Sequence, residues 1–168
     1  MRRLALAALL LLSPLCACKD KQAALPPPQE ISADATAQFC GMLLSEHAGP
    51  KGQIFLRDSA RPLWFASVRD ALAFTRMPEM PRTIVAIYVN DMGKANSWDQ
   101  PEKGTWVEAR RALYVIGSRR RSGMDTDEAV PFGGAEAARR FVAENGGRIV
   151  SFADIPPSYI FSSNGDGS

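Results

Sequence analysis

The residues best suited to chemistry lie together in the tetrapeptide Phe39-Cys40-Gly41-Met42. A thiolate and a thioether are soft ligands, and soft ligands select Cu(I). In an extended segment the side chains of residues i and i+2 point to one face, so we expect the sulfurs of Cys40 and Met42 to meet one ion. Gly41, which has no Cβ atom, can bend the chain between them. The pattern predicts a Cu(I) site built on Cys40 and Met42.

The N-terminal residues predict that the chain is exported. Arg2 and Arg3 precede nine leucine and alanine residues at positions 4–12, the order typical of a secretory signal peptide. This run is too short for a membrane-spanning helix, which needs about 20 residues. Leu15-Cys16-Ala17-Cys18 has the pattern of a bacterial lipobox. We therefore predict cleavage after residue 17 and acylation of Cys18, with palmitate among the added chains.

The predicted anchor sets both the location and the redox environment of the mature chain. Lys19, rather than an aspartate, follows Cys18, so the usual inner-membrane retention signal is absent. We expect a lipoprotein on the periplasmic side, at the outer membrane. Cysteines in such a compartment usually pair. Once Cys16 is removed and Cys18 is acylated, Cys40 has no intramolecular partner and its presence needs an explanation.

Three further roles for Cys40 remain compatible with the sequence. The thiol can be buried and inert, because a free cysteine packs like a small apolar residue; the protein would then be a lipid-anchored adaptor. It can form an intermolecular disulfide. It can also be the nucleophile of a thiol enzyme, with His47, the single histidine, as its base. The absence of Cys-x-x-Cys counts against a disulfide oxidoreductase, and the absence of Cys-x-x-Cys-His excludes a c-type haem.

A third ligand has to come from another part of the chain, and Met124 is the best candidate. Met77, Met80 and Met92 adjoin predicted elements and are explained by packing. Met124 lies in a polar, flexible loop that gives a methionine little packing role. The preceding Arg119-Arg120-Arg121 is either a solvated run or a docking patch for an acidic partner.

The elements that position these residues occur twice in the same order. In the first part, β-prone runs at 53–56 and 61–65 precede an amphipathic helix, and a buried strand follows at 84–89. Ser67 and Asp70 form a capping box at the start of that helix. In the second part, strands are predicted at 112–117, 128–132 and 148–152, with a helix before Asn145-Gly146-Gly147. An offset of 67 residues aligns Phe65 with Phe132, Ala71 with Ala138, and Phe74 with Phe141.

We therefore expect an α+β protein made of two small homologous ββαβ halves packed together, preceded by a signal peptide and a flexible tether. One continuous α+β domain with a chance repeat is the alternative. The predicted boundaries are a signal peptide at 1–17, a lipidated and proline-rich tether at 18–37, the first half at 38–93, a connector at 94–104, the second half at 105–157 and a disordered tail at 158–168.

Composition excludes several classes of function. Hydrophobic residues make up 46% and charged residues 23% of the chain, which is usual for a globular protein and not for a disordered or polytopic membrane protein. Without Arg2 and Arg3 the 20 basic residues fall to 18 and equal the 18 acidic ones. A neutral mature chain is not expected to bind nucleic acid through a basic surface. Once Cys16 is removed and Cys18 is acylated, only Cys40 and His47 remain, and these two cannot make a zinc site of four Cys and His ligands.

Four segments, in order along the chain, resemble the NosL family of lipoprotein accessory factors of nitrous oxide reductase. The resemblance extends from the lipobox to about Ile155. The segments are Phe39-Cys40-Gly41-Met42, His47-Ala48-Gly49-Pro50-Lys51-Gly52-Gln53-Ile54, Val89-Asn90-Asp91-Met92-Gly93 and Met124-Asp125-Thr126-Asp127-Glu128-Ala129-Val130-Pro131-Phe132.

The resemblance implies a copper chaperone rather than an enzyme. It implies one Cu(I) held by Cys40, Met42 and Met124, with His47 near the site, on a fold of two ββαβ halves. It also implies a role in denitrification, in which the chain supplies copper for maturation of the copper centres of nitrous oxide reductase. The implied partners are the apo-reductase and the NosDFY ABC-type membrane complex. One departure is visible: Asp125 follows Met124 where the family pattern is Met-Gly, and we expect Asp125 to restrict the approach of the loop to the metal.

Overall fold

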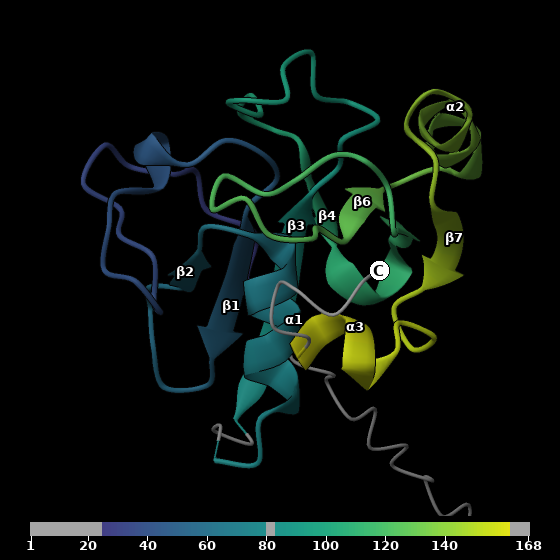
Figure 1. The fold of residues 1–168 in the computed structure, drawn as a ribbon. Coiled ribbons are helices and arrows are strands. Elements are labelled where there is room, and N and C mark those ends of the chain that lie inside the picture. The colour runs from purple at the N-terminus through teal and green to yellow at the C-terminus, as the bar shows by residue number, and fades with distance from the viewer. Residues whose placement is uncertain (1–24, 80–82, 162–168) are drawn as a thin grey trace, which may run out of the picture.

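Two antiparallel sheets form the framework of the computed structural model, which describes residues 25–79 and 83–161 (Figure 1). The signal peptide and Cys18 lie outside these residues. The first sheet has the strand order β2-β1-β3-β4, with β1 at Gly52–Leu56, β2 at Leu63–Phe65, β3 at Ile84–Asn90 and β4 at Trp106–Glu108. The second has the order β6-β5-β7, with β5 at Leu113–Ile116, β6 at Val130–Phe132 and β7 at Arg148–Ser151.

The predicted pair of ββαβ halves is confirmed. In each half the first strand lies in the middle and pairs with the second and third, and a helix connects the latter two. The helices are α1 at Val68–Arg76, α2 at Ala135–Asn145 and the short α3 at Pro157–Phe161, with 3-10 turns η1 at Leu44–Glu46 and η2 at Ala109–Arg111.

The residues aligned by the 67-residue offset occupy equivalent places. Phe65 ends β2 and Phe132 ends β6, and each is buried. Ala71 and Ala138 are fully buried where each helix crosses its sheet. A Cβ atom on Gly52 would lie only 2.5 Å from the Cβ of Ala71, so small residues are required at this crossing.

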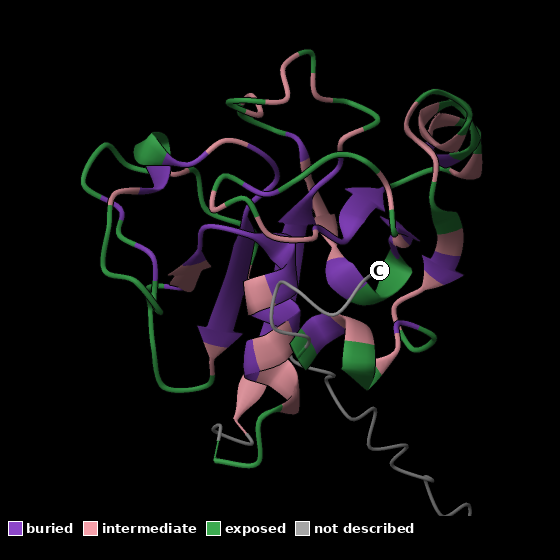
Figure 2. Ribbon diagram, viewed as in Figure 1, coloured by how far each residue is buried: buried purple, intermediate pink, exposed green. Residues whose placement is uncertain are grey.

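One apolar core joins the two halves. It combines residues of β1, α1 and β3 with residues of β5, β7 and α3, and Figure 2 shows the central strands as buried. Tyr114 of β5 is fully buried within it, and its hydroxyl donates to the carbonyl of Ala109 at 2.7 Å. The halves therefore behave as one packed body, which allows residues from both to meet at a single site.

The predicted end of the tether at residue 37 is wrong, because the chain already packs on the first sheet from Pro26. The Tyr88 hydroxyl donates to the Pro26 carbonyl at 2.8 Å, and Gln29 exchanges hydrogen bonds with the Gln53 side chain. Ala35 is also buried. The polar, proline-rich composition of this segment resembles that of a linker, but its backbone groups at Pro26 and Gln29 form hydrogen bonds with side chains of β3 and β1.

Two further boundaries also differ from the prediction. The predicted boundary at 105 placed residues 106–108 in the second half. These residues form β4, which pairs with β3 of the first half. Strand β3 has seven residues, and its edge that does not pair with β1 is available to β4. Residues 158–161, placed in the disordered tail, lie in α3, because Ile160 is 3% exposed and packs in the shared core with Ile155. None of the helices within the described ranges has the length and apolarity needed to cross a bilayer.

Candidate metal centre

Cys40 and Met42 lie at the tip of a short hairpin formed by residues 35–44. Thr36 and Leu43 pair across its base, and the Gly41 N–H donates to the Ala37 carbonyl at 2.8 Å to close the turn. Gly41 has a φ of +70°, a conformation that favours glycine. Cys40 therefore lies in a turn, and the predicted extended segment is wrong at this position. The turn leaves Cys40 exposed and Met42 46% exposed.

The hairpin is held against the first half by its own backbone and by Phe39. The Gln38 N–H donates to the Trp64 carbonyl at 2.7 Å. The Phe39 ring contacts Phe65 edge-on, with 5.5 Å between the ring centroids, and also contacts Phe74. Phe39 nevertheless stays 48% exposed beside Cys40. The thiol is thus presented on a fixed, partly apolar surface.

His47 contacts the Cys40 thiol. Its Nε2 lies 3.9 Å from the Cys40 Sγ, a distance at the long end of sulfur hydrogen bonding. The imidazole is 5% exposed, and its Nδ1 has no hydrogen-bond partner in the described structure. Buried polar atoms without partners are uncommon, and a bound ion or water is one explanation for them. Asp70 of α1 interacts electrostatically with His47, and burial raises the pKa of the Asp70 carboxyl.

The loop between β5 and β6 brings Met124 to the same place from the other half. In Figure 1 this green loop crosses toward the N-terminal segments of the first half. A Cβ atom on Gly123 would lie 2.8 Å from the His47 Cα and 2.5 Å from the Ala48 nitrogen, so the two backbones are in direct contact. Met124 is the next residue and is partly buried. The structure thus brings together the segments of all four predicted site residues, and the Cys40–His47 pair is in direct contact.

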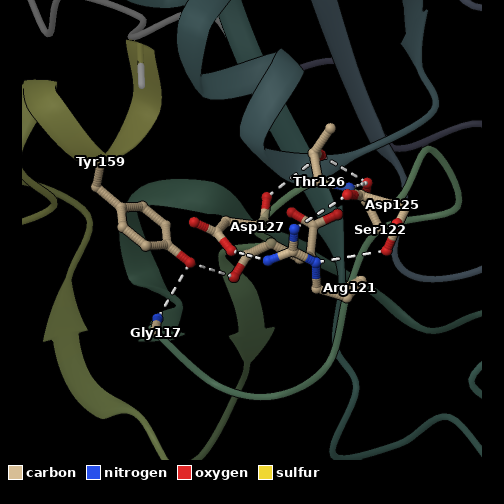
Figure 3. Close-up of polar contacts among 8 residues, drawn as sticks. Gly117, Arg121, Ser122, Asp125, Thr126, Asp127 and Tyr159 are labelled. Atoms are coloured by element: carbon tan, nitrogen blue, oxygen red, sulfur yellow. Dashed lines mark hydrogen bonds and ion pairs between the residues drawn. The ribbon is translucent and has the colours of Figure 1, made fainter. Parts of the chain in front are cut away.

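Asp125 takes the backbone conformation that a glycine would take. Its φ is +55°, in the left-handed region that aspartate tolerates better than most residues. Arg121 Nη2 donates to the Asp125 carbonyl at 3.1 Å and supports this conformation (Figure 3). The departure from Met-Gly does not keep the loop away from the site, because Gly123 still contacts His47. The expected effect of Asp125 on the approach of the loop to a metal stays a prediction.

Two of the remaining methionines adjoin regular elements of the described structure. Met92 packs in the apolar cluster of the second half, and Met77 is the C-cap residue of α1. Met80 lies outside the described residues. The three arginines each have an intramolecular contact. Arg119 donates to the Glu144 carbonyl, and the Arg120 guanidinium lies 4.7 Å from the centroid of the Trp98 ring.

Glu128 is a residue near the site that the sequence patterns missed. Its carboxylate is fully buried and accepts from the N–H groups of Arg69 at 3.0 Å and Ala129 at 2.8 Å. Burial raises its pKa to about 8. Lys51 is also buried, and burial lowers its pKa to about 8 while the charge of Glu128 acts in the opposite direction. The available signal was an acidic residue at the start of an otherwise apolar run.

A free thiol, two methionines and a buried histidine define a candidate soft-metal site between two ββαβ halves. Within the described ranges, no three His, Cys, Asp or Glu side chains form a group that could hold a metal ion. Any metal at this position would thus depend on the methionine thioethers, which bind soft ions such as Cu(I).

The chain belongs to the NosL family, whose model matches residues 28–160. It is 47% identical to a copper-binding lipoprotein NosL of Achromobacter cycloclastes over 157 residues, 93% of this chain and 80% of the relative. It is 30% identical to a copper-binding lipoprotein NosL of Stutzerimonas stutzeri over 153 residues, 89% of this chain and 78% of the relative.

Two solved structures share the fold. The crystal structure of the copper chaperone NosL from Shewanella denitrificans superposes with a TM-score of 0.73 at 30% identity, covering 79% of this chain and 99% of that one. The solution structure of apo-NosL from Achromobacter cycloclastes gives a TM-score of 0.51 at 47% identity, covering 70% and 94%.

Proposed function

We propose that this chain is a lipid-anchored metallochaperone that carries one Cu(I) on Cys40, Met42, Met124 and His47. The contact between Cys40 Sγ and His47 Nε2 carries the proposal, because it joins an exposed thiol to an imidazole whose other nitrogen has no partner in the described structure. The names of the relatives support copper as the cargo. The sulfur ligands favour the monovalent ion.

The exposure of the site suits transfer rather than storage. Cys40 and Met42 lie on an exposed turn, so an acceptor can reach the copper without opening the fold. Three or four mixed ligands bind Cu(I) less tightly than a set of thiolates would, and an incoming ligand can attach before the chaperone's ligand leaves. Copper then moves between proteins without being released into water.

The same proposal assigns the location and the partners. Acylation of Cys18 would hold the protein on the periplasmic side, with the outer membrane favoured by Lys19. The acceptor would be apo-nitrous oxide reductase, whose copper centres are completed with the NosDFY membrane complex. These assignments rest on membership of the family and on the lipobox.

A thiol enzyme that uses Cys40 and His47 fits the geometry less well. A catalytic histidine is normally oriented by a third group that hydrogen-bonds its second nitrogen. His47 Nδ1 has no such partner in the described structure. Because the relatives are named for copper binding, the proposal assigns His47 to the metal and assigns no catalytic residue.

Anaerobic Cu(I) titration against a chromophoric chelator tests the proposal on the full-length chain in detergent. We expect about one Cu(I) per wild-type chain. Cys40→Ser is expected to lower the affinity by more than about a hundredfold, since losing a supporting residue alone costs about 10–100-fold. Met42→Ala, Met124→Ala and His47→Ala are expected to have smaller effects.

Met77→Ala is the matched control for the methionine variants. Met77 is 36% exposed at the end of α1, and its loss should leave Cu(I) affinity unchanged. Equal Cu(I) uptake by wild type and Cys40→Ser would disprove the proposed function. Turnover of a thiol-reactive substrate without metal would favour the enzyme instead.

A further inference from the structure

The loop that carries Met124 is closed at its base by backbone pairing and an ion pair. Arg121 and Asp127 pair as a β-bridge, and their side chains form an ion pair (Figure 3). The Ser122 N–H donates to the Thr126 carbonyl at 2.9 Å, which closes the loop a second time. Residues 121–127, which we name the Met124 loop, therefore have a defined shape of their own.

A single hydroxyl organises the interior of the Met124 loop. Ser122 is 5% exposed, and its Oγ accepts from the Met124 N–H at 3.3 Å and from the Thr126 N–H at 3.2 Å. It also lies 2.7 Å from the Thr126 hydroxyl. A serine oxygen has two lone pairs and one proton. Because both lone pairs face N–H donors, the Ser122 proton goes to Thr126 Oγ1, whose own proton faces the Asp127 carbonyl at 3.4 Å.

The Met124 loop is fixed to the rest of the molecule on both sides of Met124. Before it, Gly123 packs against backbone atoms of His47 and Ala48, which cannot move aside as a side chain would. After it, the Glu128 carboxylate is bound at the start of α1, and the Glu128 carbonyl accepts from the Tyr159 hydroxyl at 2.9 Å. The position of the Met124 backbone thus depends on contacts with the first half, next to His47.

We infer that Ser122 is a positioning residue that holds the Met124 backbone next to His47, in place to bind copper. This inference rests on the proposed function. A ligand on a mobile loop loses conformational freedom when it binds, whereas a ligand held in advance has already lost it. The Ser122 hydroxyl fixes the Met124 N–H directly, so its removal weakens copper binding through Met124 and not through Cys40.

A double-mutant cycle on the full-length chain tests this assignment. Cu(I) affinity is measured by anaerobic competition with bicinchoninate for wild type, Ser122→Ala, Met124→Ala and the double variant. We expect Ser122→Ala to lower the affinity by about tenfold, given the modest net free energy of each hydrogen bond. In the Met124→Ala background the same change should have less than about a twofold effect.

Ser118→Ala is the matched control. Ser118 lies in the same connection between β5 and β6, and its buried hydroxyl has no hydrogen-bond partner in the described structure. Its removal should leave Cu(I) affinity unchanged with and without Met124. A comparable loss in Ser118→Ala would show that any change in this connection weakens binding, which would overturn the specific role of Ser122.

If near-UV circular dichroism shows that Ser122→Ala does not fold, a second variant tests whether the structure of the Met124 loop supports copper binding through Met124. Arg121 is partly exposed, and Arg121→Gln removes its ion pairs at the base of the Met124 loop. We expect about a threefold loss of affinity, as for a surface ion pair, and no loss in the Met124→Ala background.

The outcomes separate this inference from the proposed function. Cys40-dependent Cu(I) uptake with coupling between Ser122 and Met124 supports both. If Cu(I) uptake depends on Cys40, three results would overturn the inference and leave the proposed function standing. These are no effect of Ser122→Ala on affinity, an equal effect of Ser122→Ala with and without Met124, and no effect of Met124→Ala. Absence of Cys40-dependent uptake in wild type removes the proposed function and the inference with it.

Discussion

The carboxylate of Glu128 accepts a hydrogen bond from the backbone N–H of Arg69 at 3.0 Å, although the two residues belong to different halves. The Val68 N–H is also directed to this carboxylate, at 3.4 Å. Both N–H groups lie in the first turn of α1, where backbone donors lack intrahelical partners. The residue that follows the Met124 loop therefore completes the start of the helix that carries Asp70.

This arrangement predicts a stability that falls as the pH rises from about 5 to 8. Burial raises the pKa of Glu128 from 4.5 to about 8 in the folded protein. Between these values the unfolded chain releases the proton while the folded chain keeps it, so rising pH favours unfolding. One such group contributes at most on the order of 1 kcal/mol per pH unit. Urea unfolding measured at several pH values checks this slope.

Glu128→Gln provides the control, because glutamine keeps an acceptor for the Arg69 N–H and does not titrate. Relative to wild type, the variant is expected to gain stability steadily from pH 5 to 8. Burial also raises the pKa of Asp70, which adds a slope of the same sign to both proteins. Burial lowers the pKa of Lys51 to about 8, so its contribution lies above this window. Parallel stability curves for wild type and Glu128→Gln would contradict the prediction.

The elements of this fold were accessible from local patterns, whereas the assembly of the site was only partly so. Ser67 caps α1 by accepting from the Asp70 N–H at 3.0 Å, as the capping box predicts from residues three positions apart. The order of strands and helices followed from apolar periodicity in the same way. Cys40 and Met42 could be singled out from the sequence because the residue types identify soft ligands and the signal peptide predicts export to an oxidising compartment.

Contacts between distant residues could not be predicted in this way. The bond from Arg69 to Glu128 joins positions 59 apart, and nothing in either segment specifies the other. The contact between Gly123 and His47 likewise exists only because the shared core brings the two halves together. The turn at Cys40 was missed because the Gly41 conformation is fixed by the pairing of Thr36 with Leu43.

The lipobox predicts a matched pair of cysteine variants. Cys18→Ser should prevent acylation and release the protein from the membrane fraction, because a single acceptor thiol carries the anchor. Cys16→Ser should still be processed, since that residue is predicted to leave with the signal peptide. Mass spectrometry of the purified protein and membrane fractionation measure both effects. An unmodified N-terminus in wild type would contradict the prediction.

Gly123 is expected to tolerate no side chain. A Cβ atom there would lie 2.5 Å from the Ala48 nitrogen and 2.8 Å from the His47 Cα. Gly123→Ser should therefore destabilise the fold by about 1–3 kcal/mol, as overpacking does elsewhere. Gly134→Ser is the control, because a Cβ atom at Gly134 would have no other atom within 4 Å. Gly134 is also the N-cap residue of α2, a position at which serine is favoured. Equal stabilities of the two variants in urea would disprove the close contact.

Asp125 tests whether the Met124 loop needs its left-handed residue. At a φ of +55° a β-branched side chain is strained, so Asp125→Val should destabilise the protein by about 1–2 kcal/mol. Asp125→Asn should be neutral, because asparagine tolerates this conformation and the Asp125 side chain is 92% exposed with only a surface ion pair to lose. Thermal unfolding separates the two variants. If valine and asparagine were equally stable at this position, the loop would have relaxed to a different backbone conformation. Met124 would then not be held next to His47 in the way described.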